Sequence, residues 1–161
     1  MPGEFFFMAM GGLGVSIAGF AGLIAALTPD HQRSSAVARW RISHVVVWGL
    51  HLTFLGFGIV AIFALVNDAA TTARLASGLA ALLLAVREWR STRPGPAWPN
   101  NRGRRFAIGL ATSGVLFFMA NVGLGSVGYL HVIVLGMLLP PAMVFVSAIR
   151  DATTAGKDGS T

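Results

Sequence analysis

Residues 87–105 read REWRSTRPGPAWPNNRGRR, a stretch with six arginines, one acidic residue, three prolines and two tryptophans. The chain on either side of this stretch is almost wholly apolar, so half of its twelve basic residues lie between two apolar runs. A basic cluster of this kind can bind nucleic acid, or it can hold a membrane protein in one orientation. The composition of the whole chain decides between these two interpretations.

The composition is that of a membrane protein. Hydrophobic residues make up 55% of the 161 residues and charged residues only 11%, and the mean hydropathy is +0.70. A soluble domain is about a quarter charged, so this chain has too few charged residues to cover a water-facing surface. We therefore explain the net charge of +6 by basic residues that flank membrane spans, and we expect no nucleic-acid partner. The sequence has no cysteine, which excludes disulfides and thiolate metal sites.

Five apolar runs are long enough to cross a bilayer, because at about 1.5 Å of rise per residue each one covers roughly the 30 Å of a hydrocarbon core. We predict an all-α integral membrane bundle in a single domain, residues 1–150, followed by a flexible cytoplasmic tail at 151–161. The first run is expected to stay in the protein as a span, since MPGE is acidic where a cleaved signal peptide is basic. The transmembrane helices are predicted at about 5–27, 43–66, 70–87, 106–124 and 128–149.

The basic residues predict the orientation of this bundle. With the N-terminus outside and the C-terminus cytoplasmic, eleven of the twelve lysines and arginines lie on the cytoplasmic side. Only Arg74 lies outside, together with Glu4 and Asp68, in agreement with the positive-inside rule. The arginines of the 87–105 stretch are further expected to contact anionic lipid headgroups or a partner protein. They are Arg87, Arg90, Arg93, Arg102, Arg104 and Arg105.

The first span carries small residues at intervals of four: Gly14, Ala18, Gly22 and Ala26. Such small-xxx-small runs let two helix backbones approach closely, and this approach supplies the attraction between helices in lipid. The run is therefore predicted to be a packing face. It is compatible with packing within the chain and with an interface between subunits, and the sequence does not choose between them.

Two stretches carry a resemblance to a known kind of protein. GVSIAGFAGLIAAL at 14–27, followed by a basic loop and a second span, resembles the N-terminus of small uncharacterised bacterial multi-span proteins. NVGLGSVGYLHVIVLGMLLPPAMVFVSAIR at 121–150 is similar to the last hairpin of these proteins. The resemblance implies a multi-pass protein of the bacterial inner (plasma) membrane and no catalytic residue.

Polar side chains within the spans are the natural candidates for function, because they are costly in lipid. No Asp, Glu, Lys or Arg lies deep in a predicted span. The candidates for lining a pore or holding a cofactor are therefore His51, Thr53, Asn121 and His131. His51 and His131 are expected at different depths, so they cannot clamp one haem within a monomer.

His51 alone, or two copies of it across a dimer axis, could hold a haem or a chlorophyll-type pigment. A structural interpretation is also open for each of these side chains. In that interpretation His44 is an interfacial residue, His51 bonds a neighbouring helix, and Asn121 bonds the glycine-rich turn at 123–128 or the adjacent helix. Separately, Pro140 cannot donate a hydrogen bond to Gly136, so we expect a kink in the fifth span.

The sequence carries no pattern that indicates catalysis. It lacks a Ser-His-acid set at one depth, an HExxH motif and a pair of histidines at metal-ligand spacing. We therefore expect a non-catalytic integral membrane protein, without a cofactor, that self-associates or serves as an accessory subunit of a larger membrane complex. A small oligomeric ion channel or pore is the alternative, and a tetrapyrrole-binding protein that uses His51 is a further one.

Overall fold

The computed structural model describes residues 1, 3–27, 36–91 and 101–146, and every regular element in these ranges is a helix. The predicted tail at 151–161 and the last three residues of the predicted fifth span lie outside the described residues. A further helical segment at 139–146 follows the last labelled helix. The helices are α1 (Glu4–Leu27), α3 (Ala36–Val66), α4 (Ala69–Ser91), α5 (Asn101–Leu124) and α6 (Val127–Gly136).

In the described part of the chain, five helical segments are long and apolar enough to cross a membrane. The fifth runs from Val127 to Val146 and therefore includes both α6 and the segment at 139–146. Large apolar side chains cover the outside of the bundle; Phe5 and Leu65, for example, are each 86% exposed. An apolar surface of this extent is typical of a protein that contacts lipid or other subunits. The prediction of an all-α bundle with five helices long and apolar enough to span a membrane is confirmed for the described residues.

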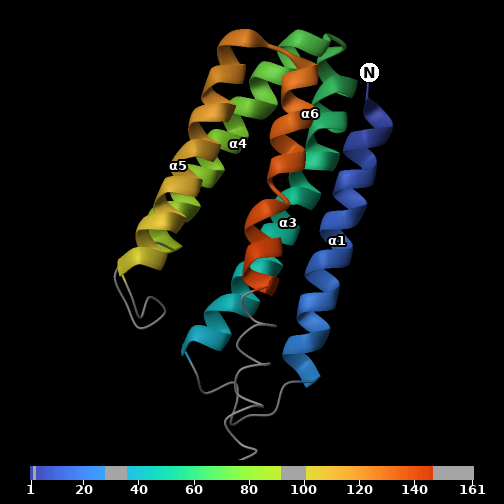
Figure 1. Cartoon of the computed structure of the whole chain (residues 1–161). Helices are drawn as coiled ribbons and strands as arrows, with labels where there is room; N and C mark the ends of the chain where they lie inside the picture. The colour runs from blue at the N-terminus through green and yellow to red at the C-terminus, as the bar shows by residue number, and fades with distance from the viewer. Residues whose placement is uncertain (2, 28–35, 92–100, 147–161) are drawn as a thin grey trace, which may run out of the picture.

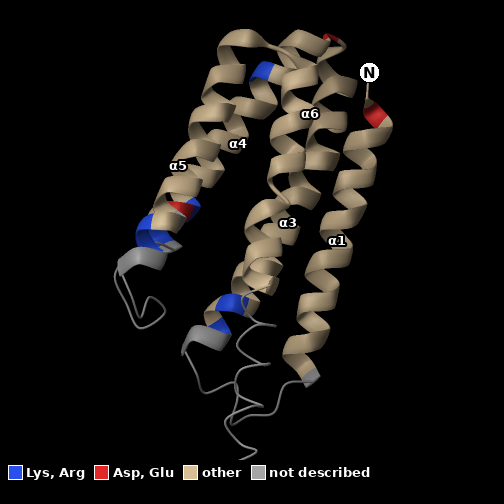
Figure 2. Cartoon of the chain, viewed as in Figure 1, with Lys and Arg blue, Asp and Glu red and all other residues tan. Residues whose placement is uncertain are grey.

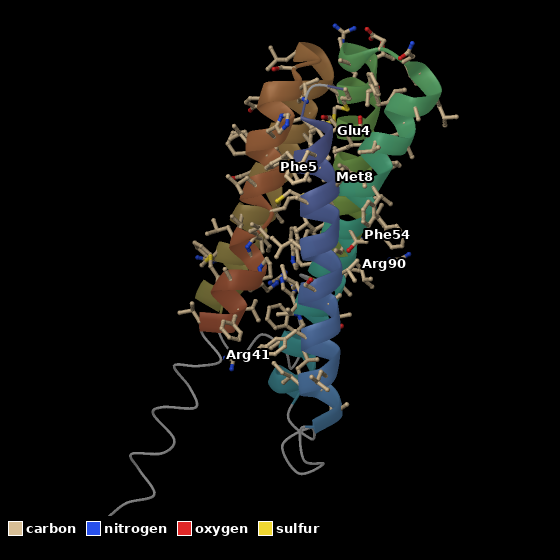
Figure 3. The ribbon with its side chains drawn as sticks, turned by 90° about the vertical axis from the view of Figure 1, so that its right-hand side faces the viewer. Glu4, Phe5, Met8, Arg41, Phe54 and Arg90 are labelled. Atoms are coloured by element: carbon tan, nitrogen blue, oxygen red, sulfur yellow. The ribbon has the colours of Figure 1, made fainter. Side chains whose placement is uncertain are left out.

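The helices form an up-and-down bundle (Figure 1). Helix α1 lies against α3, α4 lies against α5, and α6 runs back between the two pairs. Because the chain crosses the bundle an odd number of times, Met1 and Val146 belong to opposite ends of it. In Figure 3, where α1 faces the viewer, Glu4 lies near one end of the molecule and Arg41 near the other.

Charged residues gather at the two ends of the bundle, and Figure 2 shows that the ends differ in sign. The end that holds the N-terminus carries Glu4, Asp68 and the basic residue Arg74. The described arginines of the opposite end lie at the start of α3, the end of α4 and the start of α5. They are Arg39, Arg41, Arg87, Arg90, Arg104 and Arg105.

A two-residue turn joins α3 to α4. Asn67 takes a left-handed conformation with φ 54°, and its N–H donates to Phe63 O at 2.7 Å, which ends α3. Asp68 then caps α4, since its Oδ2 accepts from Thr71 N at 2.7 Å. The hydrogen bonds from Thr71 lower the pKa of the exposed Asp68 carboxyl below its ordinary value, because they favour the charged form.

The turn between α5 and α6 follows the same plan with different residues. Gly125 supplies the left-handed conformation, with φ +62°. Ser126 is the N-cap of α6, and its Oγ accepts from Tyr129 N at 3.2 Å. Both turns thus begin with a residue at positive φ and end with a side chain that caps the next helix.

The last span is interrupted where the two prolines predict it. Helix α6 ends at Gly136, residues 137–138 form a turn, and helical structure resumes at 139. Pro140 and Pro141 have no N–H to donate to the carbonyls of Gly136 and Met137. The expected kink is therefore present, and it lies about halfway along the span.

The helices differ in length at the arginine-rich end. Helix α3 has 31 residues, which is about 46 Å of helix, whereas α4 has 23 residues. Helix α3 begins at Ala36, α4 ends at Ser91 and α5 begins at Asn101. At each of these three ends the helix extends several residues beyond the predicted span. The helices run on because polar and basic residues continue a helix into the headgroup region, where hydropathy no longer marks it.

Candidate functional site

Helices α1 and α3 meet at backbone distance along a seam of small residues, Gly14, Ala18, Gly49 and Gly56, which we call the α1–α3 seam. A Cβ added at Gly14 would lie 2.5 Å from Gly49 O, and one at Gly49 would lie 2.8 Å from Ala18 N. A Cβ at Gly56 would lie 2.5 Å from Phe7 O. Only glycine fits at these three positions. The predicted packing face is thus used within the chain at Gly14 and Ala18.

The other half of the predicted face is not part of the seam. A Cβ at Gly22 would meet nothing within 4 Å, and Ala26 is exposed. The reason is geometrical, since four residues advance about 40° beyond one full helical turn. Over the three steps from Gly14 to Ala26 the run therefore winds about 120° around α1. It starts in the seam and ends on the outside of the bundle.

A second series of small residues lies on the outward side of α1. Gly12, Ser16, Gly19 and Gly22 follow one another at intervals of four, three and three residues, so Gly12, Ser16 and Gly19 lie within about 60° of one another around the helix and Gly22 lies about 60° further round. Cβ atoms added at the three glycines would meet nothing within 4 Å. We call these four residues the outer α1 face. Large exposed side chains flank it, among them Phe20 at 59% exposure.

His51 and Thr53 on α3 bond to their own helix. His51 Nδ1 lies 2.8 Å from Val47 O, and Thr53 Oγ1 donates to Gly49 O at 3.0 Å. The structural interpretation predicted that His51 bonds a neighbouring helix. In the structure, His51 instead bonds the preceding turn of its own helix, α3. Thr53 also contacts α1, because its backbone and hydroxyl lie against Gly14.

His131 lies in different surroundings from His51. Its ring stacks on Phe7, with centroids 4.5 Å apart, and it touches Phe6 and Gly3 at the start of α1. Its Nδ1 is 2.7 Å from Val127 O, the same kind of bond that His51 makes to its own helix. A bond from the second ring nitrogen to a carbonyl is common for metal-binding histidines, but both residues share it. It therefore does not single out His51 as a ligand.

Asn121 is fully buried and joins three parts of the structure. Its Nδ2 donates to Ser77 Oγ on α4 at 2.9 Å, and its Oδ1 accepts from Ser126 N at 3.1 Å. Its backbone oxygen accepts from Gly125 N at 2.8 Å. The structural interpretation named both the turn and the adjacent helix as partners, and Asn121 bonds to both. This side chain fastens the α5–α6 turn to α4.

The four polar candidates for a pore or a cofactor thus each have a hydrogen bond within the chain. Among the residues that the structure describes, no group of three or more His, Cys, Asp or Glu is placed to hold a metal ion. Within one chain, these four side chains therefore have a structural role in helix packing.

A cluster of charged and aromatic side chains lies inside the bundle near its arginine-rich end. Arg87 Nη1 is 2.7 Å from Glu88 Oε1, and both side chains are 11% exposed. The guanidinium carbon of Arg87 lies 4.4 Å from the centre of the Trp48 ring. Arg87 Nη2 is 3.2 Å from His44 Nδ1, and Trp48 Nε1 donates to His44 Nε2 at 2.8 Å. We call these four residues the inner cluster.

Sequence reasoning placed Arg87 with the lipid-facing arginines and did not consider Glu88. The structure turns Arg87 inward, because Glu88 neutralises it and Trp48 covers its apolar face. His44, expected at the interface, lies within this cluster and also stacks on Trp40. The sequence does contain a pattern that could have indicated a buried Glu88. Glu88 lies four residues after Leu84 and so continues the buried face of α4, which is formed by Ala73, Ala76, Ser77, Ala80, Ala81 and Leu84.

The structure describes the side chains of three of the remaining arginines of the 87–105 stretch. Arg90 and Arg105 are exposed, and Arg104 is half-buried. Arg93 and the side chain of Arg102 lie outside the described residues. Contact of these side chains with lipid or a partner stays a prediction.

Three cavities border the kinked part of the last span. The first, which we call the aromatic cavity, has a volume of about 320 Å³ and lies among α4, α5 and α6, with His44, Trp48 and Glu88 in its wall. The second, of about 280 Å³, includes His51 and Ile59 of α3. The third, of about 440 Å³, lies among α1, α3 and the segment at 139–146. The aromatic cavity is the one that combines apolar walls with members of the inner cluster.

Comparison with known proteins adds no further assignment. No protein family, curated protein or solved structure matches this chain. The described residues form a helical bundle with five helices long and apolar enough to span a membrane, a tight α1–α3 seam, an outer α1 face and an inner cluster beside a cavity.

Proposed function

We propose that this chain is a non-catalytic protein of the bacterial inner membrane that assembles, with copies of itself or as an accessory subunit of a larger complex, through the outer α1 face. The observation that carries the proposal is the open space at Gly12, Gly19 and Gly22. In the α1–α3 seam the same residue type brings two helix backbones into contact. The outer α1 face offers a second helix the same close approach.

The charge distribution supports a cytoplasmic arginine-rich end and an outer N-terminus. The end of the bundle that carries Glu4 and Asp68 has Arg74 as its one described arginine, and the opposite end holds the rest. Basic residues near the ends of spans are retained in the cytoplasm. There the exposed Arg90 and Arg105 are positioned to contact anionic headgroups.

The orientation has a direct test, because the sequence has no cysteine. Whole cells that carry Glu4→Cys or Lys157→Cys are treated with a membrane-impermeant maleimide. We expect labelling of the Glu4→Cys variant in intact cells and of the Lys157→Cys variant only after lysis. Labelling of both variants in intact cells would contradict an odd number of crossings.

The assembly is tested by Gly19→Leu and Gly22→Leu, which fill the outer α1 face. Neither substitution meets an atom of the same chain at its Cβ, so we expect the fold to persist while the complex in mild detergent becomes smaller by size-exclusion chromatography with light scattering. Gly109→Leu is the matched control, because it adds the same side chain at an open position on α5. An unchanged mass for the α1 variants, or equal dissociation by the control, would refute the assignment.

We favour assembly over the pore and over the tetrapyrrole site. Those alternatives depend on His51, Thr53, Asn121 and His131, and each of these makes a hydrogen bond within its own chain. A colourless purified protein and the absence of current in lipid-bilayer recordings are the results expected from a non-catalytic assembly protein.

A further inference from the structure

The last span consists of two helices joined end to end. Helix α6 ends at Gly136, residues 137–138 form a turn, and a second helical segment runs from 139 to 146. Pro140 and Pro141 fall in the first turn of that segment, where a helix has no internal use for the N–H groups that proline lacks. The prolines therefore start a new helix, and the turn before them is a junction between the two.

The backbone hydrogen bonds at this junction let the two helices move separately. A bond from Leu138 N to Leu135 O, at 3.1 Å, crosses the junction. On one side of it Met137 N donates to Ile133 O at 3.1 Å, and on the other Ala142 N donates to Leu138 O at 3.2 Å. A change of direction at the turn disturbs the crossing bond and leaves the bonds within both helices intact.

The two helices of the last span are held in the bundle to different extents. On α6, Leu130 and Val134 are fully buried, and Ser126 at its start is bonded to Asn121. On the second segment the two prolines next to the junction are buried, whereas most side chains beyond them are exposed. The exposed ones are Ala142, Met143, Phe145 and Val146. The second segment is thus anchored at the junction and loosely packed toward its far end.

Unfilled space borders the second segment on two opposite sides. Leu139 and Pro140 line the aromatic cavity, which α5 also lines and which has a volume of about 320 Å³. The third cavity, which α1 also lines and which has a volume of about 440 Å³, is lined on this side by Leu138, Pro141, Ala142, Val144 and Phe145. At 100° per residue, Leu139 and Pro140 point away from most of the second set. The segment therefore has room to move toward α5 and toward α1.

We infer that residues 139–146 form a hinged arm, which swings about the turn at 137–138 and closes either the aromatic cavity or the third cavity. A swing toward α5 closes the aromatic cavity, and a swing toward α1 closes the third cavity. In Figure 1 the arm is the part of the last span beyond the break in its ribbon. The outer α1 face is not part of either cavity wall, so the arm goes beyond the proposed function and does not depend on it.

Pairs of spin labels measure the swing directly, and the absence of cysteine from the sequence leaves every labelling position free to choose. The reporting pair is Ile108→Cys on α5 and Val146→Cys at the end of the arm, where both native side chains are exposed. The control pair is Leu116→Cys on α5 and Leu135→Cys on α6, which are exposed and lie before the junction. Both pairs are measured by double electron–electron resonance on the full-length protein in nanodiscs.

The expected result follows from the length of the arm. Residues 139–146 make about 12 Å of helix, so a swing of about 30° moves the end of the arm by about 6 Å. We expect the distances of the reporting pair to spread over about this much more than those of the control pair. Equal spreads for the two pairs would overturn the inference.

A double variant, Pro140→Ala with Pro141→Ala, tests whether the junction is the hinge. It restores two N–H groups, which can donate to the carbonyls of Gly136 and Met137 and join the two helices into one. We expect the spread of the reporting pair to fall to that of the control pair. Fraying of the chain end at Val146 would not respond to this change, so an unchanged spread would contradict the hinge.

Ala111→Leu keeps the inference testable if the proline variant does not fold. Ala111 lines the aromatic cavity and is 8% exposed, so a larger side chain fills the space into which the arm swings. We expect the shorter distances of the reporting pair to be lost and the longer ones to remain. Ala120→Leu, at an exposed position of α5 outside the cavity wall, is the matched control and should change neither. Shorter distances that persist in Ala111→Leu would show that the arm does not enter the aromatic cavity.

Discussion

The α1–α3 seam and the aromatic cavity lie in one small bundle, yet they hold helices together in opposite ways. In the seam, glycines at 14, 49 and 56 bring backbone atoms of two helices into contact and leave no space for a side chain. Around the cavity, large aromatic and aliphatic side chains border a partly open space of about 320 Å³. The seam is therefore the closely packed part of the bundle, and the cavity is a part that its own side chains leave unfilled.

The difference shows that glycine content alone does not locate a tight contact in a membrane bundle. Gly14 and Gly22 belong to one four-residue series, but only Gly14 lies in the seam. Gly49 and Gly56 were not singled out from the sequence, although they supply the other wall. A seam needs small residues on both helices at the same depth.

The largest expected effect comes from closing the seam. Gly56→Leu places a Cβ 2.5 Å from Phe7 O, so α1 and α3 must move apart. We expect a loss of about 3 kcal/mol of stability, the upper part of the usual range for overpacking. Thermal unfolding in detergent measures it. Gly109→Leu, at an open position, should change stability by less than about 0.5 kcal/mol, and equal losses would show that the seam is not special.

A smaller effect is expected at the turn that closes one end of the α5–α6 pair. Asn121→Ala removes the bonds to Ser77 Oγ and Ser126 N and leaves buried polar groups without partners. The expected loss is about 1–3 kcal/mol. In a double-mutant cycle with Ser77→Ala, the two substitutions should couple by at least about 0.5 kcal/mol. Additive losses would mean that the Asn121–Ser77 bond contributes little.

The smallest effect is expected at Asp68, which lies in the turn between the two helix pairs. Its pKa is lowered by hydrogen bonds from Thr71, so it stabilises the fold at neutral pH. This contribution is lost as the pH falls through the folded-state pKa, below the ordinary range for aspartate. Asp68→Asn keeps a capping side chain without titrating. The difference in melting temperature between wild type and variant should therefore shrink in acid, and a constant difference would contradict the assignment.

The spans, their number and the kink at Pro140 could be predicted from the sequence, because hydropathy and missing backbone donors act locally. The inner cluster could not be predicted in the same way. Arg87 and Glu88 are costly in an apolar interior one at a time, and they become tolerable only as a pair covered by Trp48. That pairing depends on how α3 and α4 face each other, which a hydropathy profile does not contain.

The outer α1 face was also not predicted from the sequence, because a different series of small residues on α1 was considered. The series from Gly14 to Ala26 was read as one face, but a strict interval of four winds around the helix. Gly12 and Gly19, which point outward, belong to a series with mixed intervals of four and three. The intervals that stay on one side of a helix are thus the more informative ones to search for.

The length of α3 has a consequence for the surrounding bilayer. Its candidate membrane span is Arg39–Val66, and the apolar stretch that follows Arg41 covers about 37 Å of helix against a hydrocarbon thickness of about 30 Å. This mismatch is relieved by tilting α3 or by local thickening of the lipid. Because the α1–α3 seam fixes the two helices to each other, α1 must tilt with α3. A change in acyl-chain length would therefore rock this pair as a unit and alter the angle that the outer α1 face presents to its neighbour.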